Sequence, residues 1–135
     1  MSMVHVILAS HGTYASGLRE AVEMIMGEQE HLAVLGLYPG DTLESFYEKI
    51  ARLLKGINEP ENVLILTDLR SGTPFNAAIM AAKTFGCVCV SGMNLPLILD
   101  VLSTRDESKM DEIVKSAVQN GREGICDSLS LGIVK

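Results

Sequence analysis

A histidine and an aspartate each follow an apolar run, and both side chains have the chemistry of an active site. His11 comes after the run at residues 4–9, and Asp68 comes directly after residues 63–67. Imidazole is nucleophilic near neutral pH, and a carboxylate that binds one ring nitrogen leaves the other nitrogen free to react. The pair therefore predicts a nucleophilic histidine. The alternatives are a loop histidine bonded to the backbone and an aspartate that only stabilises a turn.

A candidate phosphate site lies immediately after Asp68, where a predicted helix begins. The start of a helix offers backbone N–H groups and the positive end of the helix dipole, and hydroxyl and guanidinium groups add to both. An ordinary capped helix beside a solvated arginine remains the alternative. The residues concerned are Arg70, Ser71, Gly72, Thr73 and Pro74.

Four apolar runs separated by helical periodicity are the elements that must position these residues. Their near-continuous hydrophobicity is typical of parallel strands that are covered on both faces. The alternation predicts a single-domain α/β fold, a doubly wound and mainly parallel sheet of four strands with covering helices. In such a sheet ligands bind at the carboxyl ends of the strands, where His11 and Asp68 fall. The predicted strands are residues 4–9, 32–37, 63–67 and 87–91, and the predicted helices are residues 13–26, 43–54, 74–84, 95–102 and 109–120.

Capping residues mark the expected helix ends. Side chains that accept a hydrogen bond from the first turn favour a helix start, and glycine favours its end. The tail at residues 124–135 is compatible with a strand or with a loose segment. The expected starts are Asp41 with Glu44, Thr73 followed by Pro74, and Asn94; the expected ends are Gly27, Gly86 and Gly121.

Composition excludes several classes of protein. With 135 residues and 47% hydrophobic content, the chain can fold as one domain without metal or disulfides. The net charge of −6 without a basic cluster argues against nucleic acid. No run reaches the length of a membrane span and no signal peptide is visible, which favours the cytoplasm. The three cysteines form no metal or redox motif, so no metal and no cofactor are expected. His5 and His31 lie near predicted strand starts and are expected to have ordinary surface roles.

Three motifs, taken together, resemble a known family. They are Ser10-His11-Gly12, the run from Asp68 to Asn76 with Gly72-Thr73-Pro74-Phe75-Asn76, and Gly92-Met93-Asn94-Leu95-Pro96. This combination is similar to the enzyme IIA components of the mannose family of the bacterial sugar phosphotransferase system. The resemblance covers residues 4–120 without large gaps, and residues 121–135 match only loosely. It implies one enzyme IIA-like domain over residues 1–135.

The resemblance implies a phosphotransferase that works as a phosphocarrier. Such a protein accepts a phosphoryl group from the carrier protein HPr and passes it to a sugar-specific enzyme IIB. By the same match His11 is the phosphorylated residue, Asp68 orients its ring, and Thr73 with nearby N–H groups faces the phosphoryl group. The family also implies a homodimer in which the C-terminal strands are exchanged between subunits.

Two departures from the family pattern stand beside this match. Relatives commonly carry Gly-Gly where this chain has Ser71-Gly72, and Arg70 precedes that pair. The chain shows no second domain after residue 135, so enzyme IIB is expected to be a separate chain. The alternatives are the phosphotransferase subunit that serves dihydroxyacetone kinase and a regulatory module that has lost phosphotransfer. The sugar, and the ring nitrogen that carries the phosphate, remain open.

Overall fold

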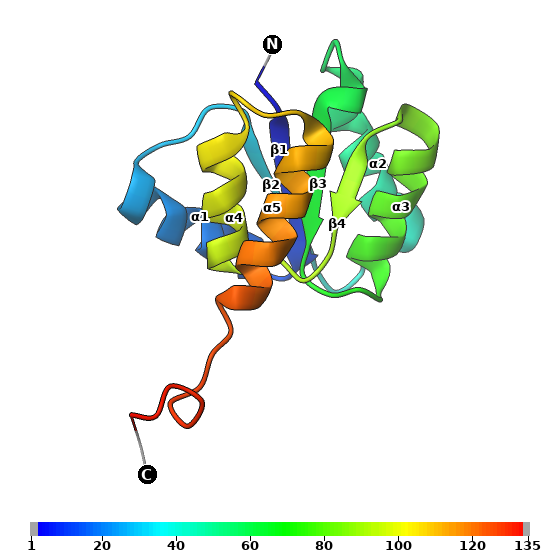
Figure 1. The fold of residues 1–135 in the computed structure, drawn as a ribbon. Helices are drawn as coiled ribbons and strands as arrows, with labels where there is room; N and C mark the ends of the chain where they lie inside the picture. The colour runs from blue at the N-terminus through cyan, green and yellow to red at the C-terminus, as the bar shows by residue number, and fades with distance from the viewer. Residues whose placement is uncertain (1–2, 134–135) are drawn as a thin grey trace.

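A four-stranded sheet forms the centre of the protein, whose computed structural model describes residues 3–133 (Figure 1). The strands are β1 (His5–His11), β2 (Leu32–Leu37), β3 (Val63–Thr67) and β4 (Val88–Val90). They pair in parallel in the order β2-β1-β3-β4. The predicted fold class is confirmed. The first strand is longer than expected, because its pairing with β2 continues as far as His11 and Leu37.

Helices cover both faces of the sheet. One face is covered by α1 (Tyr14–Met26), α4 (Leu95–Thr104) and α5 (Met110–Glu123), and the other by α2 (Leu43–Lys55) and α3 (Thr73–Phe85). A short 3₁₀ helix, η1 (Pro60–Asn62), precedes β3. Among the helices of residues 3–133, none has both the length and the hydropathy that crossing a bilayer requires.

Two buried cores follow from the alternation of side chains along each strand. In β1, Val6 and Leu8 point to the face with α1, α4 and α5, whereas Ile7 and Ala9 point to the face with α2 and α3. Because both faces are buried, the strands read as continuous apolar runs and not as alternating ones. Each large aliphatic side chain in these cores contributes about 1.5–3 kcal/mol through burial.

Three of the expected helix boundaries were wrong in detail: the starts of α2 and α3 and the end of α5. The start of α2 is capped by Thr42, whose hydroxyl accepts from the Ser45 N–H, and not by Asp41 with Glu44. Thr73 is the first residue of α3, and Gly72 is its N-cap.

The fifth helix runs through Gly121 and ends at Glu123. The reason is packing, since Gly121 is buried against α4 and its carbonyl accepts a hydrogen bond from the Asn94 side chain. Asn94 itself caps α4 as expected, because its side-chain amide oxygen accepts from the Leu97 N–H.

The tail leaves the body of the protein after α5 (Figure 1). Residues 125–127 have no regular structure and residues 128–133 form turns and a bend, without strand pairing, and the side chains of both segments are exposed. Ile125, Leu129, Leu131 and Ile133 are the large apolar residues among them. Residues 134–135 lie outside the described residues, and exchange of this segment between subunits stays a prediction.

Candidate functional site

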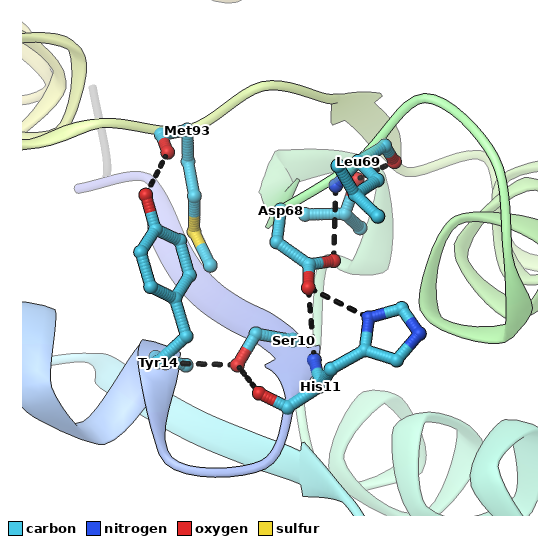
Figure 2. A network of polar contacts seen from close by, with 8 residues as sticks. Ser10, His11, Tyr14, Asp68, Leu69 and Met93 are labelled. Carbon is cyan, nitrogen blue, oxygen red and sulfur yellow. Dashed lines mark hydrogen bonds and ion pairs between the residues drawn. The ribbon is translucent and has the colours of Figure 1, made fainter.

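His11 and Asp68 meet at the carboxyl edge of the sheet. The chain runs from β1 to β2 on one side and then crosses to β3 on the other side of β1, so β1 and β3 are neighbours at the point where the strand order reverses. The last register pair of these two strands is Ala9 with Thr67, and both functional residues lie beyond it. The Nδ1 atom of His11 is 2.7 Å from Asp68 Oδ2 (Figure 2).

Asp68 holds both the backbone and the ring of His11. Its Oδ2 atom also accepts a 3.0 Å bond from the His11 N–H, and its Oδ1 atom accepts from the Leu69 N–H at 3.0 Å. Burial raises the pKa of the Asp68 carboxyl, but the hydrogen bonds from His11 and Leu69 lower it more, so the net shift is downward. The carboxyl is therefore ionised at neutral pH and accepts from an Nδ1–H.

The other ring nitrogen of His11 is free to react. With the proton on Nδ1, the lone pair lies on Nε2, and Figure 2 shows this side of the ring pointing away from Asp68. The His11 side chain is 48% exposed and that of Asp68 only 12%. The site thus presents a half-exposed imidazole ring to solvent and keeps the orienting carboxylate largely buried.

Ser10 fixes the turn that carries His11. Its buried hydroxyl donates to the His11 carbonyl at 3.0 Å and accepts from the Ala15 N–H at 2.8 Å. It therefore joins the end of β1 to the first turn of α1. The sequence placed Ser10 in a motif without assigning this role, although a serine shortly before a helix start is a known capping signal.

The start of α3 lies against the reactive side of the ring. A Cβ atom at Gly72 would be 3.3 Å from His11 Cε1 and 3.6 Å from Nε2, and Gly72 has a φ of +99°. Glycine therefore leaves room for a group on Nε2 and adopts a backbone conformation that other residues disfavour. The N-terminus of α3, with Pro74 in its first turn, begins at the next residue.

The other residues of the predicted phosphate loop lie close by in the chain but do not bond the histidine. Arg70 and Ser71 are exposed, and Thr73 is half-buried. Across residues 3–133, the hydrogen bonds of His11 that involve a side chain are those with Ser10 and Asp68. The structure thus brings together His11, Asp68 and Gly72, and it leaves roles for Arg70, Ser71 and Thr73 as predictions.

Two residues that the sequence did not indicate also line the site. Tyr14 and Leu69 form, with His11 and Asp68, an open hollow of about 360 Å³. The Tyr14 hydroxyl donates to the Met93 carbonyl at 2.9 Å. An aromatic residue three positions after the histidine was the available signal for Tyr14, whereas nothing in the sequence marks Leu69.

The other candidate ligands lie elsewhere. His5 and His31 are at the opposite edge of the sheet, as expected, and their rings stack with centroids 4.0 Å apart. Burial, with a smaller effect from Cys89, raises the pKa of the Cys87 thiol to about 11, which agrees with a packing role. Residues 3–133 contain no cluster of three or more His, Cys, Asp or Glu side chains that could hold a metal ion.

Comparisons with known proteins place the chain in a family. A family model described as the PTS system fructose IIA component matches residues 5–118, a range that includes the whole site. The sequence is 34% identical over 115 residues to the fructose-specific EIIA component of Bacillus subtilis (strain 168), which covers 84% of this chain and 79% of that protein. It is 35% identical over 125 residues to the mannose-specific EIIAB component of Escherichia coli (strain K12), which covers 90% of this chain. That alignment spans 38% of the EIIAB protein's length.

Solved structures show the same architecture. The mannose/sorbose specific IIA subunit from Enterococcus faecalis aligns with a TM-score of 0.86 at 30% identity and covers 93% of this chain and 95% of that one. A phosphotransferase system component EIIA from Streptococcus agalactiae also aligns with a TM-score of 0.86, at 26% identity, over 95% of this chain and 99% of that one.

Proposed function

This chain belongs to the family of PTS fructose IIA components, and on that premise we propose that it is a phosphocarrier that accepts a phosphoryl group on Nε2 of His11. The observation that carries the proposal is the 2.7 Å contact between Nδ1 and Asp68, which leaves Nε2 beside Gly72 on the side of the ring away from that contact. The proposed donor is phospho-HPr and the proposed acceptor is an enzyme IIB, as the family resemblance implies. The proposed location is the cytoplasm.

The transfer is a displacement between two histidines. The lone pair on Nε2 of His11 attacks the phosphorus atom of the donor's phosphohistidine. A P–N bond forms to Nε2 while the donor's P–N bond breaks, and the electron pair of that bond returns to the donor ring. Nδ1 keeps its proton, and the Asp68 carboxylate offsets the positive charge that develops on the imidazole of His11. The same displacement, with His11 as the donor, passes the group to enzyme IIB.

The rest of the site stabilises the transferred group. Phosphoryl transfer needs positioning and charge stabilisation more than covalent chemistry from the protein. The backbone N–H groups and the dipole at the start of α3 lie next to Gly72 and suit the phosphoryl oxygens. We assign Gly72, Ser71 and Thr73 to this role, with Arg70 as an added positive charge at the rim.

The relatives favour a sugar system but do not select the sugar. Their names include mannose, fructose and sorbose. They give no support to the dihydroxyacetone kinase subunit or to a regulatory module without phosphotransfer. We also propose a homodimer, in which the exposed apolar residues of the tail are covered by a second copy.

Intact-mass spectrometry tests the acceptor directly. The protein is incubated with enzyme I, HPr and phosphoenolpyruvate under conditions that preserve acid-labile phosphate. We expect one phosphoryl adduct in the wild type and none in His11→Ala, whose fold should be retained because the side chain is half-exposed and contributes little to core packing. His31→Asn is the matched control, since asparagine tolerates the φ of 51° at that position. An adduct on folded His11→Ala would overturn the assignment.

A further inference from the structure

Tyr14 combines a fixed position with an exposed ring. Its side chain belongs to the first residue of α1 and is 46% exposed, yet its hydroxyl donates to the Met93 carbonyl at 2.9 Å. Met93 is itself held, because its N–H donates to the Thr67 carbonyl at 3.0 Å. The ring is thereby tied to the residue that precedes Asp68. Figure 2 shows Tyr14 and His11 on opposite sides of Asp68.

The surface that Tyr14 lines is apolar although it surrounds an ionised group. Leu69, 56% exposed, contributes another side chain to the same hollow of about 360 Å³. Asp68 already accepts three hydrogen bonds, from the N–H and the ring of His11 and from the Leu69 N–H. Its carboxylate therefore needs no polar partner from outside. The hollow suits an apolar side chain better than a polar one.

The place of the hollow identifies its occupant. His11 is one of its lining residues, so the hollow adjoins the surface that a protein delivering a phosphoryl group to Nε2 contacts. Single exposed apolar residues are common and need no explanation. Two that share a hollow with the nucleophile are suited to bind an apolar side chain of a partner protein. A ring that is fixed beforehand also loses less conformational entropy when a partner binds.

We propose that Tyr14 is a specificity-determining residue that forms one wall of a socket for an apolar side chain of the phosphorylated donor protein. The inference rests on the proposed phosphocarrier function. The socket is the part of the hollow that is lined by Tyr14, Leu69 and Asp68. Tyr14 contributes to binding of the donor and not to the displacement at His11, which depends on the contact with Asp68.

Steady-state transfer from phospho-HPr, with enzyme IIB present in excess as the final acceptor so that His11 turns over, separates these two contributions. Tyr14→Ala removes the wall, and we expect the KM for phospho-HPr to rise about tenfold while kcat stays within about twofold, because truncation of an anchoring tyrosine weakens binding by this order. Tyr14→Phe keeps the ring and loses only the bond to Met93, so its KM should rise by less than about threefold. Ile25→Ala, an exposed apolar truncation on the same helix outside the hollow, should leave both constants unchanged.

The outcomes distinguish this inference from the function on which it rests. A wild type that takes no phosphoryl group from phospho-HPr contradicts the proposed function. A wild type that is phosphorylated, with an unchanged KM in Tyr14→Ala, contradicts only the socket. A fall in kcat at constant KM would also overturn it, because Tyr14 would then act on the geometry of His11. Circular dichroism on each variant confirms that the comparison is between folded proteins.

Discussion

Asp68 decides which nitrogen of His11 can react. The carboxylate accepts from both the backbone N–H and Nδ1, so the ring is fixed in orientation and in tautomer by one oxygen atom. The downward shift of the Asp68 pKa keeps that oxygen charged through the neutral range. Neutral pH lies well above the ordinary pKa of 3.8, and the pKa of Asp68 is lower still. Titration of this carboxyl should therefore not contribute to the pH dependence of transfer near neutrality.

We predict that Asp68→Asn slows phosphoryl transfer by about 100-fold or more without abolishing it. An asparagine amide can donate to Nδ1, which would place the ring proton on Nε2, where the nucleophilic lone pair is needed. Rapid-quench measurement of phosphate uptake from phospho-HPr gives the rate. An unchanged rate would show that Asp68 is structural only.

Gly72 provides the second residue-level test. We predict that Gly72→Ala lowers stability by about 1–2 kcal/mol and slows transfer, because its φ is +99° and the added Cβ would lie 3.6 Å from Nε2. Gly40→Ala is the matched control, since Gly40 has a φ of +97° but open space around it. Urea denaturation should show similar losses for the two variants, and only Gly72→Ala should impair transfer. Equal transfer rates in both would mean that Nε2 is not approached from this side.

At the scale of elements, the pairing of α4 with α5 depends on a glycine that the sequence alone would place at a helix end. A Cβ at Gly121 would lie 3.1 Å from the Leu97 side chain, and the Gly121 carbonyl accepts from Asn94 at 2.9 Å. Asn94 thus caps α4 and binds α5 with the same amide. The close approach of the two helices, and not the end of a helix, explains why a glycine stands at position 121.

We predict opposite effects for two helical glycines. Gly121→Ala should destabilise the protein by about 1–3 kcal/mol, because the methyl group must displace Leu97. Gly17→Ala, in α1 with open space around it, should stabilise by about 0.5–1 kcal/mol, because alanine reduces the backbone entropy of the unfolded chain. Thermal and urea denaturation of both variants measures the two signs. A stabilised Gly121→Ala protein would refute the packing explanation.

At the scale of the whole molecule, the carboxyl ends and the amino ends of the strands have different roles. The carboxyl ends of the strands carry the proposed phosphorylation site, whereas the buried side chain of Arg105 holds the amino ends together. Its guanidinium donates to the carbonyls of Val4, Glu30 and His31, which joins the starts of β1 and β2 to the end of α4. His5 stacks on His31 beside this cation.

We predict that acid destabilises the protein through these amino ends. Burial, then the neighbouring His31 and Arg105, lower the pKa of His5, so the folded state favours the neutral ring. The stabilisation is complete above the ordinary pKa of 6.5 and is lost as the pH falls through the lower folded value. Calorimetry should give a Tm that falls between about pH 7 and about pH 5.

A variant separates His5 from the other titrating groups. His5→Phe keeps an aromatic ring for the stack and removes the titration, so its Tm should fall less steeply over the same pH range. Glu59 lines, together with His5, a second hollow at the amino ends of the strands, and it remains in both proteins. Parallel slopes in the two proteins would assign the acid sensitivity to other groups.

Much of the fold and the centre of the site could be predicted from the sequence. Continuous apolar runs identified the four strands, and the histidine and aspartate that follow two of them identified the pair that the structure brings into contact. The three strand-end motifs indicated the family, which the match over residues 5–118 confirms. The cap of α2 and the end of α5 were predicted wrongly, because several nearby residues can satisfy the same local pattern and packing chooses among them.

The sequence by itself determined the elements and their chemistry, because hydrophobic periodicity and residue type are local properties of the chain. Only the tertiary structure decided that β1 and β3 are neighbours, so that residues 57 positions apart lie 2.7 Å from each other and one nitrogen of His11 is left free. It alone placed Gly72, Tyr14 and Leu69 around that histidine. Strand order and side-chain packing depend on contacts between distant parts of the chain, and no local pattern records them.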